Sequence, residues 1–418
     1  MTGEDRTRKA GRLERAGRST LEWLLARLAG AEALYALGER HLVHGRLALI
    51  LPDGSRRVFG GRRPGPSAEV EILRWRALGR MATGGALGFA RSYIDGDWQS
   101  PDLMALCELA SRNRETMGEG LKGHLLIRFV DRIRHLLRSN SRERARRNIA
   151  YHYDLGNDFY AAWLDASMTY SAGIFAEGDN SLEAAQARKY RRLLDLLGTR
   201  PGDRILEIGS GWGGFAEIAA SERGADVTGL TLSESQLAYA RERIARAGLE
   251  ERVRFRLQDY RDETGSYDHI VSIEMFEAVG ERYWPTYFRK IRECLKPGGR
   301  AALQIITIDE ALFPAYRRGA DFIQTYIFPG GMLAPMSALR REAAAAGLLW
   351  QDAQGFALGY AETLAAWRRR FEDAFRAGRL PQGFDESFRR IWNFYLAYCE
   401  GGFRGGSIDV QQIALERP

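Results

Sequence analysis

An acidic residue and a run of small residues in the middle of the chain have the types and spacing of a cofactor site. Glu207 lies in an apolar strand expected over 204–208, and a glycine-rich turn follows it. The small residues of this turn are Gly209, Ser210, Gly211 and Gly213. Glycines let the backbone approach a ligand closely, and the start of the helix expected over 213–223 presents unpaired N–H groups. The turn is therefore a candidate site for a nucleotide-like cofactor.

The position of the acidic residue distinguishes two kinds of cofactor. A dinucleotide site carries its acidic residue at the end of the next strand, where this chain has Thr231, Leu232 and Ser233. Here the acidic residue precedes the glycines instead. The turn thus favours S-adenosylmethionine over NAD, with Glu207 accepting hydrogen bonds from the ribose hydroxyls. The alternatives are a structural turn without a ligand and a carboxylate that stabilises the helix start.

An alternation of strands and helices must position this turn. Strands are expected at 204–208, 225–230, 253–257, 270–273 and 300–306, and helices at 181–197, 213–223, 234–247 and 283–295. Ser181 is expected to cap the first of these helices. The alternation predicts an α/β fold with a doubly wound, mostly parallel sheet, in which ligands bind at the carboxyl ends of the strands.

The N-terminal part predicts a separate, smaller α+β domain over 20–114, after a flexible tail at 1–19. Its expected elements are a helix at 21–37, a hairpin over 46–59 that turns at Asp53-Gly54, a strand at 69–73, and helices up to about residue 114. We find no catalytic constellation in this part of the sequence.

A basic stretch separates the two parts. Within the linker expected at 115–150, only Asp131 and Glu143 oppose the lysine and arginines between Lys122 and Arg147. Apolar residues recur there at roughly helical spacing, which predicts a basic amphipathic helix. Such a helix either docks on anionic lipid headgroups or is an ordinary solvated helix between domains.

The overall charge points in the same direction. The formal net charge is +7 and the pI is about 9.3, which suggests an acidic partner, either nucleic acid or an anionic membrane surface. The alternative is a basic proteome. No apolar run reaches membrane-spanning length, and the N-terminus lacks a secretory core, so we expect a cytosolic protein. Cys107, Cys294 and Cys399 lie far apart, which predicts neither a disulfide framework nor a metal site.

Eight motifs, taken together, resemble the cyclopropane-fatty-acyl-phospholipid synthase family, including the mycolic-acid cyclopropane synthases. They lie at 151–160, 170–173, 206–214, 229–233, 258–262, 274–280, 326–331 and 403–404. The resemblance covers about residues 148–415, because the motifs occur in the family's order. It implies a class I, Rossmann-like methyltransferase domain over 151–418 with a seven-stranded sheet, and residues 308–348 are expected as an insertion that forms a lid.

The resemblance also implies a reaction. Family members transfer a methyl group from S-adenosylmethionine to the double bond of an unsaturated acyl chain in a phospholipid, which leaves a carbocation. Loss of a proton from the new methyl group closes a cyclopropane, whereas loss from a neighbouring carbon leaves a methyl-branched or methylene product. The resemblance further implies a lipid-engaging N-terminal domain, a homodimer formed through it, and a peripheral location on the inner face of the membrane.

In the family, a bicarbonate ion serves as the base. The positions that hold it match Ala172, Glu277, Gln304, Ile306 and Tyr360 of this chain. Two of them depart from the synthases, which have Cys in place of Ala172 and His in place of Gln304; Ala278 also replaces a His. We therefore leave cyclopropane and methyl-branched products open, and we hypothesise that Glu277 is itself the base, its pKa raised by apolar surroundings.

Further site residues follow from the resemblance. By their positions, Tyr170 and Ser171 are expected to contact the methionine end of the cofactor. Thr231, Leu232 and Gln236 are expected to contact its ribose and adenine. Gln258, Asp259 and Tyr260 are expected to contact the adenine. The alternatives are structural turns and a helix cap. His152 and Cys399 are weaker catalytic candidates, with a structural histidine and inert packing as their alternatives. Tyr360 either holds an anion or stabilises the cation through its ring face.

Two other functions compete with acyl-chain methylation. A methyltransferase for a small soluble metabolite would leave the basic linker and the N-terminal domain without a role. A lipid-binding protein without catalysis would not need the glycine turn at 209–214. Nucleic-acid methylation is disfavoured, because the sequence has no Asn/Asp-Pro-Pro-Tyr/Phe loop.

Overall fold

The computed structural model describes residue 35 and residues 38–116, 155–178 and 181–418. The expected tail at 1–19, nearly all of the helix expected at 21–37, the basic stretch at 117–150 and His152 lie outside the described residues. The chain divides into two compact units, Met1–Asp131 and Arg132–Pro418. Each unit is described by itself.

The first unit is a small sheet with helices. Its elements are β1 (His44–Ile50), β2 (Arg56–Gly60), β3 (Arg63–Ile72), α2 (Arg76–Ile94), β4 (Trp98–Gln99) and α3 (Leu103–Arg112). The strand order is β2-β1-β3-β4, with β1 antiparallel to β2 and parallel to β3. The predicted hairpin is confirmed: the chain reverses between β1 and β2, where Gly54 has a φ of +81° and donates its N–H to Leu51 O.

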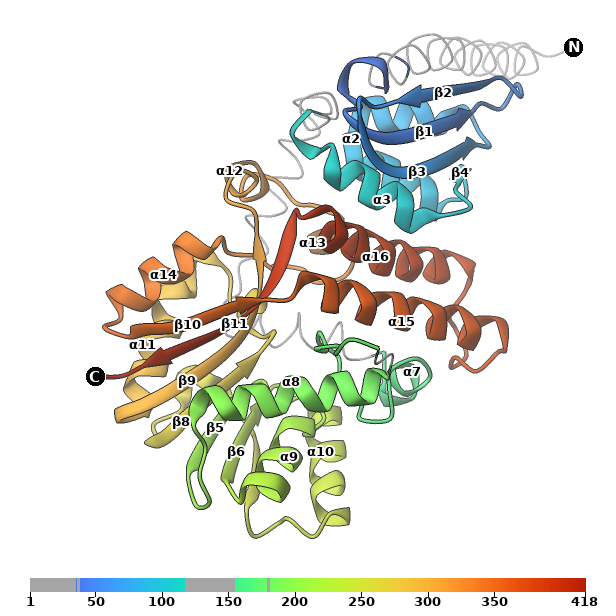
Figure 1. Cartoon of the computed structure of the whole chain (residues 1–418). Helices are drawn as coiled ribbons and strands as arrows, with labels where there is room; N and C mark the ends of the chain where they lie inside the picture. Colours follow the sequence, from blue (N-terminus) through green and yellow to red (C-terminus); the bar gives the residue numbers. More distant parts are fainter. Residues whose placement is uncertain (1–34, 36–37, 117–154, 179–180) are drawn as a thin grey trace, which may run out of the picture. The chain divides into compact units, whose positions relative to one another are not determined.

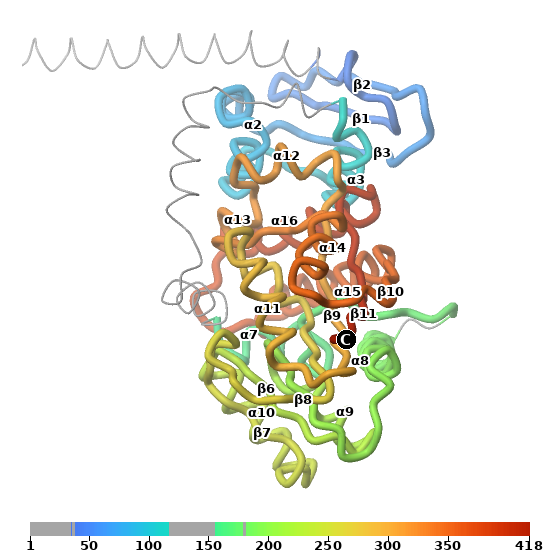
Figure 2. The backbone as a smooth tube through the Cα atoms, turned by 90° about the vertical axis from the view of Figure 1, so that its left-hand side faces the viewer, coloured from blue at the N-terminus to red at the C-terminus, as the bar shows by residue number. Residues whose placement is uncertain are grey.

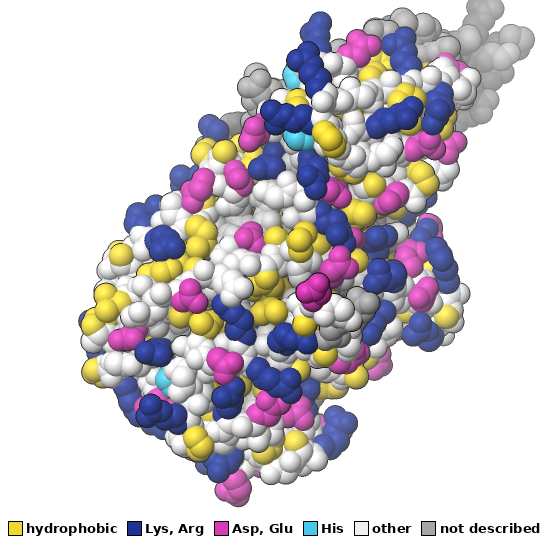
Figure 3. Space-filling model, in the orientation of Figure 1, with side chains coloured by type: hydrophobic (Ala, Val, Ile, Leu, Met, Phe, Trp, Pro, Cys, Tyr) yellow, Lys and Arg dark blue, Asp and Glu magenta, His cyan; other side chains and the backbone are white. Residues whose placement is uncertain are grey.

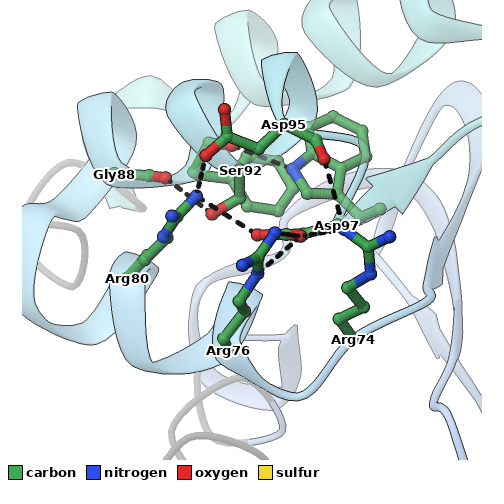
Figure 4. A network of polar contacts seen from close by, with 9 residues as sticks. Arg74, Arg76, Arg80, Gly88, Ser92, Asp95 and Asp97 are labelled. Atoms are coloured by element: carbon green, nitrogen blue, oxygen red, sulfur yellow. Dashed lines mark hydrogen bonds and ion pairs between the residues drawn. The ribbon is translucent and has the colours of Figure 1, made fainter.

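A buried carboxylate organises the end of this unit's sheet. The Asp97 side chain is fully buried, and the guanidinium groups of three arginines converge on it (Figure 4). The N···O distances are 3.2 Å to Arg74, 2.7 Å to Arg76 and 3.2 Å to Arg80. The arginine side chains stay partly exposed, so water hydrates their outer atoms.

We expect Asp97→Ala to lower the free energy of unfolding of the N-terminal unit by about 1–3 kcal/mol, because it removes hydrogen bonds made by a buried charge. Asp95→Ala is the control, because the Asp95 side chain is 47% exposed and its ion pair with Arg80 is solvated. Urea denaturation of both variants measures the difference. An equal, small loss of unfolding free energy in both variants would contradict a stabilising role for Asp97.

The second unit contains a seven-stranded sheet in the order β10-β11-β9-β8-β5-β6-β7 (Figure 1). The strands are β5 (Arg204–Ile208), β6 (Asp226–Thr231), β7 (Val253–Leu257), β8 (Tyr267–Ile273), β9 (Leu295–Ile308), β10 (Leu349–Gly355) and β11 (Ile408–Glu416). All neighbouring pairs are parallel except those made by β11, which runs antiparallel to β9 and to β10. The strand order reverses between β5 and β8, where such sheets bind ligands at the carboxyl ends.

Helices cover both faces of this sheet. One core contains apolar side chains of α8 (Leu182–Leu197), α9 (Gly214–Arg223) and α10 (Glu234–Arg246); the other contains those of α11 (Trp284–Cys294) and α14 (Met336–Ala345). Figure 2 shows α8 and α11 on opposite sides of the strands. Ser181 caps α8 by accepting a hydrogen bond from Ala184 N at 3.2 Å, as predicted.

In this unit, two strands and several boundaries differ from the expected elements; β8, for example, starts at Tyr267 instead of residue 270. β10 and β11 were not located from the sequence, although a seven-stranded sheet was expected from the resemblance. The residues 296–299, expected as a turn between helix and strand, lie within β9. These four residues do not pair with β8. Tyr267 of β8 pairs with Leu295, and the next paired residue, His269, pairs with Arg300.

Several helices lie beyond the carboxyl ends of the parallel strands. They are α7 (Asn157–Ala161), α12 (Phe313–Tyr316), α13 (Phe322–Tyr326), α15 (Ala357–Arg376) and α16 (Glu386–Gly405). α15 and α16 pack side by side (Figure 1). Of the expected insertion at 308–348, α14 packs on the sheet beside α11; that the rest closes as a lid stays a prediction. Among the described residues, no helix has both the length and the apolar character needed to cross a membrane.

Candidate active site

The turn after β5 has a backbone that suits glycine. Gly209, Gly211 and Gly213 have φ values of +85°, +51° and +84°, and residues with a Cβ rarely adopt such values. A Cβ at Gly213 would lie 3.0 Å from Phe255 Cζ, whereas a Cβ at Gly211 would meet no atom within 4 Å. The turn is therefore closely packed on one side and open at Gly211.

Two buried polar atoms beside this turn lack a hydrogen-bond partner in the part of the chain that the structure describes. Glu207 is 3% exposed, and its Oε2 atom and Ser210 Oγ are both unpartnered. Burial raises the pKa of Glu207 well above its ordinary value, against the opposing charges of Lys189 and Arg243. A buried acceptor next to an open glycine turn fits the ribose diol of S-adenosylmethionine. The residues present thus fit the cofactor that the sequence predicts.

The predicted residues after β6 form the cap of α10. Thr231 Oγ1 bonds to Gln236 Oε1 at 3.1 Å, and Ser233 Oγ accepts from Gln236 N at 3.3 Å. Leu232 is half-buried between them. The helix cap, one of the alternatives considered for these residues, is therefore present, and their contact with the cofactor stays a prediction.

The predicted residues after β7 have partners within their own loop. Asp259 forms a bidentate pair with Arg261, at 2.8 Å and 2.5 Å. Gln258 Nε2 donates to Glu263 Oε2 at 3.0 Å. The Tyr260 ring packs edge-on against Tyr287, with centroids 5.5 Å apart. These contacts fix the loop at the carboxyl end of β7, where an adenine contact stays a prediction.

Tyr170 and Ser171 lie in a loop that leads into α8. Tyr170 Oη is 2.7 Å from Tyr395 Oη, and its ring centroid is 5.1 Å from that of Trp367. Ser171 Oγ accepts a hydrogen bond from Lys189 Nζ at 2.5 Å. Lys189 is fully buried, and burial lowers its pKa to about 7, although Glu274, Asp165 and Glu207 act in the opposite direction. This ammonium group places a positive charge near the buried carboxylates.

Glu274 lies immediately after β8, at the start of the motif at 274–280. No catalytic or binding role was predicted for it. Its Oε1 accepts from Ala172 N at 2.8 Å and from Gln304 Nε2 at 2.7 Å. Its Oε2 accepts from Tyr360 Oη at 2.6 Å. The one available signal was its position, an acidic residue directly after an apolar strand. The structure thus brings three of the predicted residues together around a carboxylate that was not predicted.

The backbone of Glu274 is strained. Its φ of +50° lies in the left-handed region, which costs a residue with a Cβ about 1 kcal/mol or more. Among the described residues, only Met168 is also a non-glycine residue with positive φ. Burial raises the pKa of Glu274, while Tyr360, Lys189, Ala172 and Gln304 act to lower it.

Glu277, a half-buried residue, supplies the second carboxyl group of the site. Its Oε1 accepts from Ile306 N at 2.5 Å, and its buried Oε2 atom has no partner among the described residues. Burial, and then the charge of Glu274, raise the pKa of Glu277 to about 8. This is the direction that the hypothesis of Glu277 as base requires; its role in catalysis stays a prediction.

The roles of the weaker catalytic candidates, Cys399 and His152, stay predictions. Cys399 is half-buried on α16, and its charged form would oppose ionisation of Tyr360 and Tyr395. His152 lies outside the described residues.

Aromatic rings surround this part of the site. Tyr360 stacks on Phe403, with centroids 4.4 Å apart, and meets Trp367 edge-on at 6.2 Å. Tyr170 links this group to the glycine turn, because Tyr160 packs on it at 5.4 Å and on Trp212 at 5.2 Å. Aromatic faces stabilise cations. The site can therefore hold a cation next to a buried base.

A sheet of this order, with an open glycine turn and an unpartnered buried carboxylate at its switch point, defines a class I S-adenosylmethionine-dependent methyltransferase. The sequence profile described as "Mycolic acid cyclopropane synthetase" matches residues 140–413. The chain belongs to this family, as its motifs predicted, and it is a C-methyltransferase of the cyclopropane synthase type.

Two curated relatives align over nearly their whole length. The tuberculostearic acid methyltransferase UfaA1 of Mycobacterium tuberculosis is 42% identical over 402 residues, 93% of this chain and 92% of the relative. The cyclopropane-fatty-acyl-phospholipid synthase of Escherichia coli is 35% identical over 376 residues, 89% of this chain and 93% of the relative.

Solved structures agree with this assignment. The mycolic acid cyclopropane synthase CmaA1, complexed with SAH and CTAB, superimposes with a TM-score of 0.60 at 31% identity, over 65% of this chain and 98% of that one. The cyclopropane synthase MmaA2 of Mycobacterium tuberculosis gives a TM-score of 0.61 at 30% identity, over the same shares.

We expect Glu207→Gln to weaken binding of S-adenosylhomocysteine on the order of 10-fold to 100-fold, because an amide is a poorer acceptor for the ribose diol than a carboxylate. Glu222→Gln is the control, since Glu222 pairs with Arg191 on the exposed side of α9. Isothermal titration calorimetry measures both. Equal affinities in the two variants would exclude Glu207 from the cofactor site.

The raised pKa of Glu277 predicts a pH-dependent stability. Between its ordinary value of 4.5 and about 8, the folded protein holds a proton that the unfolded chain has lost. The stability that this group contributes is complete below pH 4.5 and is lost as the pH rises to about 8. In Glu277→Gln, the fall of unfolding free energy across this range should be shallower by up to about 1.4 kcal/mol per pH unit. Urea denaturation across the range tests this, and parallel curves for variant and wild type would contradict it.

Proposed function

We propose that this protein transfers a methyl group from S-adenosylmethionine to the double bond of an unsaturated acyl chain in a membrane phospholipid. The observation that carries the proposal is the pair of half-buried glutamates, Glu274 and Glu277, which share the site with the aromatic rings around Tyr360. Methylation of an oxygen or nitrogen atom would not need a cation-stabilising, water-excluding site of this kind.

The proposed chemistry assigns different tasks to the cofactor and to the chain. The bound cofactor supplies an electrophilic methyl group. The chain holds the alkene in line with that group, which matters because an alkene is a poor nucleophile. The aromatic rings around Tyr360 and Tyr170 exclude water and stabilise the cation formed on the acyl chain. A buried carboxylate then accepts the proton that the cation loses, so that the proposal needs no bicarbonate.

The lipid substrate is supported by the relatives and by charge. The Escherichia coli relative is named for a fatty-acyl phospholipid. On the face that Figure 3 shows, basic and acidic side chains of the described residues are intermixed. We therefore assign attraction to an anionic membrane surface to the basic stretch between Lys122 and Arg147. A homodimer formed through the N-terminal unit is part of the same proposal.

The proposed product is a methyl-branched or methylene-bearing chain rather than a cyclopropane. A fatty acid methyltransferase is the more similar of the two relatives, at 42% identity against 35% for the cyclopropane synthase. Gln304 also stands where the synthases are expected to have histidine, so the group at that position cannot titrate.

Mass spectrometry tests the substrate and the product together. The purified protein is incubated with vesicles of unsaturated phosphatidylglycerol and with S-adenosylmethionine carrying a CD₃ group. We expect a lipid one methylene heavier that takes up hydrogen over a catalyst, because the product keeps a double bond. Two retained deuterium atoms indicate a methylene group, and three indicate a methyl group beside the double bond.

Other outcomes contradict the proposal in different ways. A product with two deuterium atoms that resists hydrogenation is a cyclopropane, which would overturn the branched product and leave the substrate standing. Methylation of a soluble metabolite but not of lipid would favour the competing enzyme. Binding of lipid and cofactor without any turnover would favour a lipid-binding protein.

A further inference from the structure

The groups that the family resemblance assigns to bicarbonate already have a partner in this chain. Ala172 N, Gln304 Nε2 and Tyr360 Oη all donate to the carboxylate of Glu274, over 2.6–2.8 Å. A fourth assigned donor, Ile306 N, bonds to Glu277. The donor set is therefore occupied by the protein's own carboxyl groups.

The orientation of Gln304 is set by a chain of donors behind it. Arg192 Nη1 donates to Gln412 Oε1 at 2.5 Å, and Gln412 Nε2 donates to Gln304 Oε1 at 2.9 Å. Because its oxygen is engaged, Gln304 directs its NH₂ group at Glu274. The side chain of Gln304 thus presents a hydrogen-bond donor, and not an acceptor, to an anion at the position of the Glu274 carboxylate.

Bicarbonate does not fit these residues. It would compete with Glu274 for the same three donors, and it would add a negative charge beside two buried carboxyl groups. A carboxylate offers the same planar pair of oxygen atoms as bicarbonate, so one group can stand in for the other.

The strained backbone at Glu274 indicates that its side chain has a function. Its φ of +50° is one that glycine adopts without strain, and yet the position carries a long, half-buried acidic residue. The protein retains this strain together with three hydrogen bonds to the carboxylate. Strained residues of this kind cluster at functional sites.

We propose that the carboxylate of Glu274 replaces bicarbonate as the base of the methyl-transfer reaction. This inference rests on the proposed function. One alkene carbon bonds the methyl group as the methyl–sulfur bond breaks, with its electron pair left on sulfur, and the other alkene carbon becomes the cation. A C–H bond of the methylated chain then breaks. Its electron pair closes the new C=C bond, its proton goes to Glu274, and Glu274 passes the proton to water after product release. No oxidant or reductant is required.

A pair of variants tests this proposal. Glu274→Gly removes the carboxylate, relieves the backbone strain and leaves room for a small anion among the three donors. Glu274→Gln removes the charge but still fills the same space. We expect both to lose activity by ~100-fold or more in buffer depleted of carbon dioxide. Added bicarbonate should restore part of the activity of the glycine variant and none of that of the glutamine variant. Unchanged affinity for S-adenosylhomocysteine in both variants shows that the fold is intact.

Binding of ¹³C-bicarbonate, followed by NMR, gives a readout that does not depend on turnover. We expect no binding to the wild-type protein and saturable binding to Glu274→Gly. Wild-type protein that binds bicarbonate, or whose activity rises when bicarbonate is added to depleted buffer, would overturn the proposal and leave the proposed function intact. Full activity of Glu274→Gly without bicarbonate would also overturn it. Bicarbonate binding is measured even if no lipid is methylated. Failure of the Glu274 proposal is therefore distinguishable from failure of the proposed function.

Discussion

Satisfying the hydrogen bonds of the half-buried Glu274 carboxylate is the constraint on which the arrangement around the site depends. A buried carboxylate without hydrogen bonds would be strongly unfavourable. Its three donors come from the loop before α8, from β9 and from α15, at sequence separations of 102, 30 and 86 residues. The loop, the strand and the helix must all be in place before this charge is satisfied. The hydrogen bond from Tyr360 also holds its aromatic ring against Phe403 and Trp367, so the same contact satisfies the charge and positions the rings.

The central part of the fold followed from local sequence signals. β5, β6, β7 and the helices between them were expected within a residue or two. β5 carries an apolar run, β7 alternates apolar and basic residues, and Ser233 caps α10. β10 and β11 could not be located in this way. β10 is largely exposed at the sheet edge, and β11 carries the buried Gln412, whose side-chain partners Gln304 and Arg192 are distant in sequence. Tertiary contacts, not local pattern, make these two strands.

The cofactor turn was predictable for a similar reason, since Glu207 and the glycines after it are neighbours in sequence. The catalytic part was different. The motifs singled out Ala172, Gln304, Ile306 and Tyr360 through the family resemblance, and the structure brings three of them to one point. The role of Glu274 as their common acceptor was not predictable. Its left-handed backbone and its distant donors cannot be recognised from the residues next to it in sequence. Asp259 shows the opposite case: a polar residue at the expected strand end is engaged by its neighbour Arg261.

The strand order also has a consequence for how the chain reaches its native state. β11 is the final element of the chain, yet it lies between β9 and β10, and it is the strand on which β10 pairs. As the polypeptide emerges from the ribosome, β9 therefore presents an unsatisfied edge until β11 has been made. Such an edge is prone to pair with other chains. Because Gln412 of β11 also orients Gln304, a nascent chain completes the hydrogen bonds around Glu274 in the same late step that closes the sheet.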